Sequence, residues 1–273
     1  MINFEKTLIT PAKAKELLEA NIENRKIRHG RIIQLANDII EGRWMEDTAE
    51  TIKIAKTGRI LDGQHRLHAI VKANKPIYCH IATNLDESVF KVIDTGAVRS
   101  ATDIFKIDKI KNDKQLPSII AFFNVLQAEK RRKSIHINDK PTNAMLLDQY
   151  YENENFWQLI VRNAHAWYIS FAKILSPSII GGFYAHLYKI DSDKAYSFMN
   201  QLATGLNIEN DVVAMLRTKL MQDKISMRKM PQEIKIALII KAWNVYITKQ
   251  SLKQLKFNIE SEEYPVAISI YSK

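Results

Sequence analysis

The chain has 273 residues, of which 46% are hydrophobic, so a mainly disordered protein is excluded and one large domain or two ordinary ones are expected. Eight Gly and seven Pro are too few for a collagen-like repeat or a series of tight hairpins, and the single cysteine, Cys79, excludes an intramolecular disulfide and suits a reducing cytoplasm. Forty basic against thirty acidic residues give a net charge of +10, and such a protein attracts polyanions.

The first part of the chain changes its apolar periodicity several times, which predicts a mixed α+β unit. Thr10 followed by Pro11 is typical of a capped helix start, and Gly42 is placed to end a later helix. The predicted elements are, in chain order, a helix from Pro11, a helix over 32–40, strands over 51–55 and 59–61, a helix over 64–73 and a strand over 77–82. A helix is therefore expected between the strands of one small unit.

Beyond about residue 112 strand patterns nearly vanish, and amphipathic runs separated by short polar breaks predict helices. These helices are expected over 116–130, 142–150, 156–170, 177–188, 193–203, 211–222 and 231–248. The predicted fold class is α+β, with a small domain over 1–110 followed by a mostly α-helical domain over 111–273. Lysines interrupt the most apolar stretch, 234–247, so no membrane-spanning segment is expected, and the first residues do not form a signal peptide.

The positive charge is concentrated in two blocks of the sequence. Residues 99–133 contain nine basic and four acidic side chains, a surplus of +5, and residues 214–256 contain ten against two, a surplus of +8. A surplus of this size attracts polyanions, of which nucleic acid is the commonest in a cytoplasm. The helical domain is therefore expected to bind DNA or to oligomerise, and a solvated lysine-rich surface with no such partner stays open as the alternative.

The most specific motif is Asp62-Gly63-Gln64-His65-Arg66, which follows a predicted strand and forms the first turn of a predicted helix. Free backbone N–H groups and the helix dipole favour an anion there, and Gly63 permits close approach of a ligand. Arg66 offers a planar fork to phosphate oxygens, and His65 offers a donor or acceptor that titrates near neutral pH. Asp62 is a candidate for orienting a ribose hydroxyl, holding a divalent cation or acting as a base, and the alternative is a helix cap.

With neighbouring segments, this motif resembles the ParB/sulfiredoxin superfamily. The resemblance covers roughly residues 9–85 and is carried by Asn24-Arg25, by Glu41-Gly42-Arg43-Trp44 and above all by the Asp-Gly-x-His-Arg core of residues 62–66. It implies a small α+β fold whose loop and helix hold nucleotide phosphates. Branches of the superfamily bind CTP as a DNA-clamp switch, use ATP to repair sulfinic acid, phosphorylate free serine or are called nucleases. On this resemblance, the nucleotide site is lined by Asn24, Arg25, Gly63, Gln64 and Arg66.

The sequence departs from each branch in an informative way. Gln64 stands where sulfiredoxins have their reactive cysteine, which argues against that repair reaction, and residues 63–66 differ from the Gly-Glu-Arg-Arg of chromosome-partitioning ParB proteins. Free-serine kinases differ from the motif only at Gln64, so phosphoryl transfer remains open. With residues 93–103 and Lys241-Ala242-Trp243-Asn244 included, the whole chain resembles ParB-like proteins often encoded by bacteriophages.

Two other patterns have weaker support. Asp94-Thr95-Gly96 has the form of an aspartic-protease signature, but those enzymes are almost all-β dimers, so a tight turn is expected here. Arg99, which follows that turn, either reaches the same ligand as Arg66 or has only a structural role. His65 and His68 lie three residues apart near Asp62, yet no downstream ligands complete a metal site.

Together these features predict a nucleotide-binding, ParB-like protein of phage or mobile-element origin that acts with or on DNA in the host cytoplasm. ATP or CTP with Mg²⁺ is the expected cofactor, with Arg66 stabilising phosphate charge, His65 donating to it or moving a proton, and Asp62 acting as base or metal tether. The alternatives are a non-catalytic DNA-binding regulator on the same scaffold and a ParB-like nuclease. The sequence leaves open whether the site is catalytic and whether the chain forms homo-oligomers.

Overall fold

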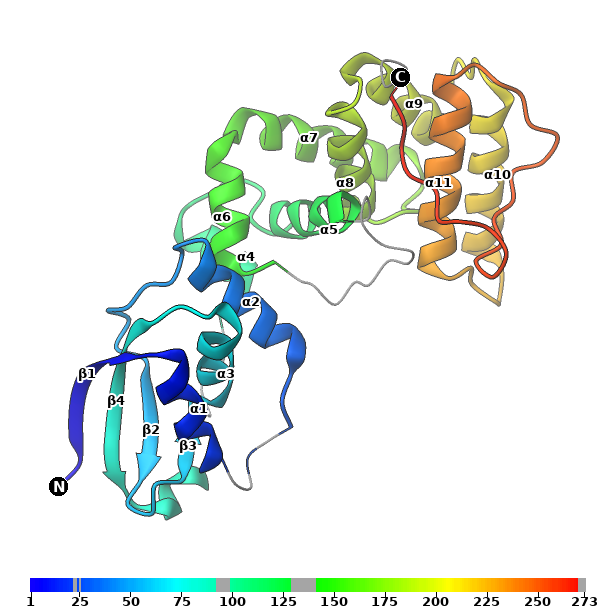
Figure 1. Ribbon diagram of the computed structural model, residues 1–273. Helices are drawn as coiled ribbons and strands as arrows, with labels where there is room; N and C mark the ends of the chain where they lie inside the picture. Colours follow the sequence, from blue (N-terminus) through cyan, green and yellow to red (C-terminus); the bar gives the residue numbers. More distant parts are fainter. Residues whose placement is uncertain (22–23, 25, 92–98, 129–140, 270–273) are drawn as a thin grey trace. The chain divides into compact units, whose positions relative to one another are not determined.

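The computed structural model describes residues 1–269 apart from 22–23, 25, 92–98 and 129–140. Within these residues, contacts divide the chain into two compact units, the first running to Arg99 and including 141–144, and the second comprising the rest from Ser100. The first contains a four-stranded mixed sheet and the second is mostly helical, so the expected α+β class is confirmed (Figure 1). No helix in the described ranges has the length and apolarity needed to cross a membrane.

The sheet of the first unit has the strand order β1-β4-β2-β3. Its strands are β1 (Asn3–Ile9), β2 (Thr51–Ala55), β3 (Ile60–Asp62) and β4 (Ile77–Leu85). β1 runs antiparallel to β4, β2 runs parallel to β4, and β3 runs antiparallel to β2. In this register Lys53 is paired with Asp62 on one neighbouring strand and with Ala82 on the other, so the end of β3 lies beside the middle of β2.

The sheet is covered mainly on one face, by three helices (Figure 1). These are α1 (Pro11–Glu19), α2 (His29–Ile40) and α3 (Gln64–Ala73). Their shared core includes Ile9, Ala36, Ile39, Ile52, Ile60, Leu67, Ile70 and Ile81. Leu61 belongs to a smaller cluster with Val89 and Phe90 of the short 3-10 helix η1 (Glu87–Lys91), because successive residues of a strand point to opposite faces.

Local sequence accounts for most of these elements. The predicted strand 51–55 and helix 64–73 are confirmed, and the Thr10 hydroxyl accepts a hydrogen bond from Lys13 N at 3.1 Å as the cap of α1. β1 was not predicted, because only Ile9 of this edge strand is buried and the others show no alternating apolar pattern.

The second unit consists mainly of helices. They are α4 (Ala101–Ile107), α5 (Leu116–Ala128), α6 (Asn143–Glu152, whose first residues belong to the first unit), α7 (Glu154–Ser170), α8 (Pro177–Tyr188), α9 (Ser192–Thr204), α10 (Asp211–Ile225) and α11 (Gln232–Ile247). The sequence predicted each of them except α4. The expected domain boundary at residue 110 falls inside this unit, because Phe105 and Ile110 are buried in its core.

Two adjacent glycines allow α8 to approach α5 closely. A Cβ on Gly182 would lie 2.5 Å from the ring carbon Cδ1 of Phe122 and 3.1 Å from the backbone nitrogen of Phe123, and one on Gly181 would lie 2.8 Å from Ile119. Any larger residue would push the helices apart, so these glycines are required by packing and not by a turn.

The late motif Lys241-Ala242-Trp243-Asn244 holds the C-terminal segment against α11. The Asn244 side-chain amide donates to the carbonyl of Val266 at 2.9 Å and accepts from the N–H of Ile268 at 3.0 Å, as a strand partner would. Trp243 Nε1 donates to the carbonyl of Ile268 at 3.1 Å. The motif is therefore explained by packing within the helical unit.

Candidate functional site

The candidate site is the junction between β3 and α3, where Gly63 takes a left-handed conformation with φ 103°. A Cβ at this position would lie 3.0 Å from Cγ1 and 3.3 Å from Cα of Ile52. Glycine is thus required both by the backbone and by the close approach of β2. The side chain of Ile52 therefore occupies the space that a side chain at position 63 would need, and this space is part of the core of the sheet. Gly63, the N-cap residue of α3, has no side chain with which to cap that helix.

Asp62 lies at the end of β3 and accepts hydrogen bonds at both carboxylate oxygens. Its Oδ1 accepts from Gly63 N at 2.7 Å, and its Oδ2 accepts from Lys53 Nζ at 3.1 Å and from Arg66 Nη2 at 3.3 Å. The three charged side chains are largely but not wholly buried, since 27% of Lys53, 19% of Asp62 and 14% of Arg66 are exposed. Two cations therefore share one carboxylate at the rim of the junction.

Arg66 has a second anchor within the first unit. Its Nη2 donates to the carbonyl of Thr51 at 2.8 Å, which ties the first turn of α3 to the start of β2. The sequence predicted that this guanidinium grips phosphate, and the structure places it against protein acceptors. Burial raises the pKa of the Cys79 thiol to about 11. The positive charge of Arg66 acts in the opposite direction and lowers this pKa, but its effect is smaller than that of burial. This buried thiol on β4 is therefore not a reactive one.

Gln64 and His65 are buried and contact the segment between α1 and α2. Asn21 Nδ2 donates to Oε1 of Gln64 at 3.2 Å, and the backbone N–H of Arg28 donates to Nε2 of His65 at 3.1 Å. The Nε2 atom must be unprotonated to accept this bond. The two residues thus join α3 to the segment before α2, and in this arrangement Nε2 cannot donate to a ligand.

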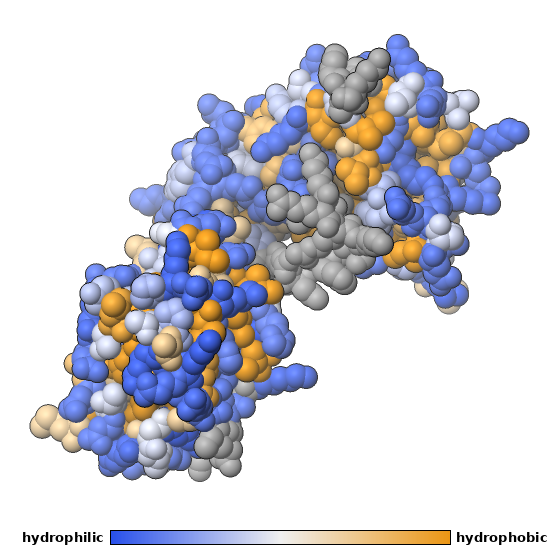
Figure 2. All heavy atoms as spheres, in the orientation of Figure 1, coloured by the Kyte–Doolittle hydropathy of each residue, from blue (hydrophilic) through white to orange (hydrophobic). Residues whose placement is uncertain are grey.

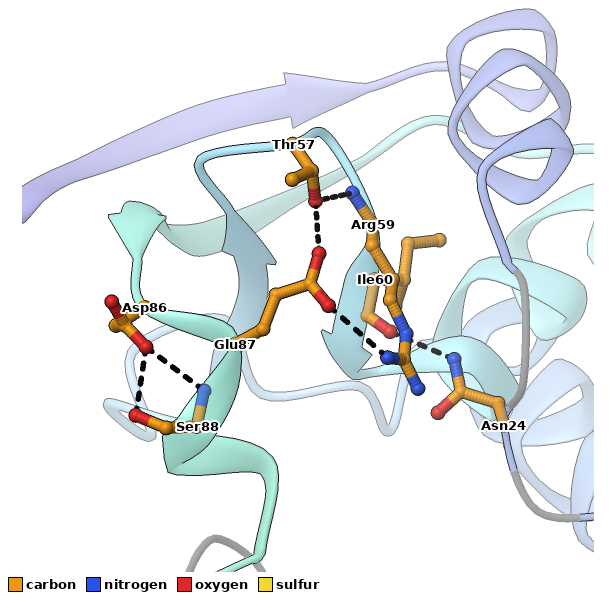
Figure 3. A network of polar contacts seen from close by, with 7 residues as sticks. All are labelled: Asn24, Thr57, Arg59, Ile60, Asp86, Glu87 and Ser88. Carbon is orange, nitrogen blue, oxygen red and sulfur yellow. Dashed lines mark hydrogen bonds and ion pairs between the residues drawn. The ribbon is translucent and has the colours of Figure 1, made fainter.

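Asn24 lies beside β3 and contributes to the same junction (Figure 3). Its Nδ2 donates to the carbonyl of Ile60 at 2.7 Å and to Oδ1 of Asn21 at 2.6 Å. On the other side of Ile60, Arg59 Nη1 lies 3.3 Å from Oε2 of Glu87, and its guanidinium carbon lies 4.9 Å from the centre of the Phe90 ring. The side chain of Asn24 therefore fixes the backbone of β3 just before the motif.

The remaining predicted residues either lie outside the described part of the chain or form no described side-chain contact with Asp62 or Arg66. Arg25 and the turn 94–96 lie outside the described residues. Arg99 has an exposed side chain, and its carbonyl accepts from Asn143 Nδ2 at 3.2 Å; among the described contacts none links it to the motif. His68 lies near His29, and its pKa is lowered by burial and by the charge of that neighbour.

The donor set does not fit a Mg²⁺ ion held at Asp62. One carboxylate oxygen already has two cationic partners, so a divalent cation on Asp62 would lie beside both positive charges and be repelled by them. Within the described ranges no group of three or more His, Cys, Asp or Glu side chains is arranged to hold a metal. We therefore assign no step to a metal at this position.

Lys53 is the residue of the junction that sequence reasoning missed. The predicted hairpin of 51–55 and 59–61 indicated only that Lys53 lies near the end of the second strand, because the register of Ile54 with Ile60 would continue to Lys53 with Leu61. A register shift between Lys53 and Ile54 brings Lys53 opposite Asp62 instead. Asn21 and the backbone of Arg28 had no comparable signal, since their contacts depend on how the segment between α1 and α2 packs.

In the helical unit, part of the predicted basic surface is used internally. Arg217 donates to the carbonyls of Leu202 and Ala203 at the end of α9, and burial lowers its pKa. Lys235 and Lys241 form ion pairs with acidic residues of the same unit. By contrast, the last turn of α4 and the residues that lead from it to α5, together called the α4–α5 connection, carry exposed lysines that have no ion pair within the described chain: Lys106, Lys109, Lys111 and Lys114.

No family model, curated protein or solved structure matches the chain.

Proposed function

We propose that the first unit binds the phosphates of a nucleoside triphosphate, ATP or CTP, at the N-terminus of α3, and that the helical unit brings the protein onto DNA. The observation that carries this proposal is that Lys53 and Arg66 share the single carboxylate of Asp62 next to the N-terminus of α3. The junction thus has an excess of positive charge in a partly buried place, which is favourable for an anion.

A phosphate group would compete with Asp62 for the two cations. Both contacts of Arg66 in the described part of the chain use Nη2, so Nε and Nη1 are the donors that it offers to a ligand. Lys53 adds a second positive charge on the adjacent strand. Phosphate oxygens that replace the carboxylate would gain charge-assisted hydrogen bonds from both side chains.

The contacts support binding more than catalysis. A general base needs a free acceptor beside the substrate, and in Asp62 only Oδ1, which accepts from Gly63 N, keeps acceptor capacity, because Oδ2 already accepts from two cations. His65 is buried and its Nε2 accepts a backbone N–H. We therefore favour a regulator whose state depends on nucleotide, and phosphoryl transfer by these two residues stays an unproved prediction.

The DNA part of the proposal depends on the helical unit. The four lysines of the α4–α5 connection, Lys106 to Lys114, are exposed and unpaired within the described chain, so they are available to phosphates. Each such contact releases counterions, and affinity for DNA should fall steeply as salt increases. The ParB-like resemblance of the first unit supports the same partner.

Calorimetry on the full chain tests the nucleotide site. ATP, CTP and GTP are titrated into the parent protein, into Arg66→Ala and into Lys72→Ala, which removes an exposed lysine at the opposite end of α3. We expect binding of at least one triphosphate, a loss of about tenfold or more in Arg66→Ala and no change in Lys72→Ala. Negligible heats for all three nucleotides would refute the proposal.

A further inference from the structure

The connection between α10 and α11 exposes two apolar side chains that the core does not use. Ile225, the last residue of α10, is 84% exposed, and Met227 is fully exposed. Hydrophobic and hydrophilic side chains lie side by side at this end of the helix pair (Figure 2). We call residues 224–230 the α10–α11 tip.

The tip is held in a defined conformation. Asp223 is buried at its base, where it pairs with Lys235 Nζ at 2.6 Å and accepts a short hydrogen bond from the backbone nitrogen of Met230. Lys229 Nζ donates to the carbonyls of Asp223 and Lys224 at the end of α10, and Ser226 Oγ donates to the carbonyl of Arg228 at 2.9 Å. Ile225 and Met227 are thus presented by an anchored loop, which limits the ordering cost of binding.

The charge of the tip selects the kind of partner. Residues 224–230 contain three cations and no acidic side chain, and the carboxylate of Asp223 is already paired with Lys235. Arg228 is exposed, and its guanidinium forms no ion pair in the described part of the chain. A polyanion that also offers an apolar place to insert is therefore the complementary partner.

We propose that the tip is a DNA wedge: Met227 and Ile225 insert between base pairs from the minor groove, while Arg228 contacts a flanking phosphate. Lys224 adds a second phosphate contact when its Nζ leaves the carbonyl of Lys173, to which it donates at 3.2 Å. Apolar residues that enter a base step unstack it and bend the duplex, and the neighbouring cations hold the backbone. This inference rests on the proposed DNA-binding function and adds to it the element that touches the bases.

Two alternatives fit the tip less well. A stable protein partner needs roughly 800 Å² of surface on each side, and two apolar residues on one narrow loop offer much less. An anionic membrane could accept the tip alone, but the same unit also carries the exposed lysine cluster of the α4–α5 connection, from Lys106 to Lys114. Two separate cationic elements on one unit are better matched to a long polyanion.

The test uses the full chain and a short duplex that carries 2-aminopurine and a donor–acceptor dye pair at its ends. Anisotropy gives the affinity, 2-aminopurine fluorescence gives base unstacking, and energy transfer gives bending. The variants are I225S/M227S, Arg228→Gln and Leu206→Ser, the last a control because Leu206 is a 66% exposed apolar residue of another connection. Vesicles with and without phosphatidylserine form a separate arm.

The wedge predicts that the parent unstacks and bends the duplex, and that I225S/M227S loses both signals and about tenfold or more in affinity, with an unchanged dependence on salt. Arg228→Gln should lower that salt dependence by about one phosphate contact. Leu206→Ser should behave as the parent.

The failures are distinguishable. If I225S/M227S binds and bends DNA as the parent does, the wedge is wrong and DNA binding stands. If the parent binds no DNA at low salt, the DNA-binding proposal and the wedge both fail. Binding of the parent only to phosphatidylserine vesicles, lost in I225S/M227S, would replace DNA with a membrane as the partner of the tip.

Discussion

Arg66 and Asp62 form an ion pair across the β3–α3 junction, with Nη2 of the arginine 3.3 Å from Oδ2 of the aspartate. The same oxygen lies 3.1 Å from Lys53 Nζ. Under the proposed function, Asp62 occupies the place that a phosphate oxygen would take and competes with the ligand for these two cations. This assignment differs from that of a catalytic base and leads to an opposite expectation for its removal.

Asp62→Asn should tighten triphosphate binding by about three- to tenfold. The amide keeps an oxygen that can accept from Gly63 N, but it removes the negative charge that holds Lys53 and Arg66. Calorimetry with the best-bound nucleotide measures the change, and Asp47→Asn, at an exposed carboxylate paired with Lys6, is the matched control. Weaker binding in Asp62→Asn would show that the carboxylate serves the ligand.

Gly63→Ala should destabilise the first unit by about 2 kcal/mol. The alanine would be strained at φ 103° and its Cβ would crowd Ile52. Gly42→Ala is the control, because Gly42 also has a positive φ of 76° but open space around its Cβ, so about 1 kcal/mol is expected there. Urea unfolding followed by hydrogen exchange of β2 and α3 gives both values, and equal losses would contradict a packing role for Gly63.

Asp223 should make the helical unit sensitive to acid. Burial opposes ionisation, but hydrogen bonds from Lys235 and from the backbone of Met230 outweigh it and lower the pKa of Asp223. A carboxyl group with a lowered folded-state pKa stabilises the protein above its ordinary pKa near 4, and this contribution is lost as the pH falls further. Unfolding of the parent and of Asp223→Asn should therefore differ by about 2 kcal/mol at pH 7 and converge below about pH 4. A constant difference would contradict this.

Asn244→Leu should release the C-terminal segment while α11 remains folded. Its amide is replaced by a side chain of similar size that cannot pair with the backbone at Val266 and Ile268. Hydrogen–deuterium exchange should rise by about tenfold in residues 256–269 and stay unchanged in α8. Unaltered exchange of the segment would mean that Trp243 and other contacts hold it.

The elements were predictable where their periodicity was strong. The runs 51–55, 64–73 and 177–188 have the alternation, the cap or the apolar face that their structures require, and the structure has them at those bounds. β1 was not predicted because an exposed edge strand has no such pattern, and α4 was not predicted because it is short. Sequence periodicity reports burial, so elements with little buried surface give little signal.

The candidate site was predictable in its place but not in its contacts. The Asp-Gly-x-His-Arg motif does lie at the end of a strand and the start of a helix. That Arg66 turns to Thr51 O, and that His65 accepts from Arg28 N, depends on segments brought together by the fold. The use of charged side chains was equally hard to predict. Arg217 was counted in a basic block of the sequence, but in the structure its guanidinium donates to the last carbonyls of α9.

The most direct measurement of the central claim is the amide spectrum of the isotope-labelled full chain during titration with ATP and CTP. If nucleotide phosphates bind at the start of α3, the largest shifts occur in residues 62–67 and in the Nε–H of Arg66, and they disappear in Arg66→Ala and persist in Lys72→Ala. Shifts confined to the helical unit, or none at millimolar nucleotide, would contradict a phosphate site at the start of α3.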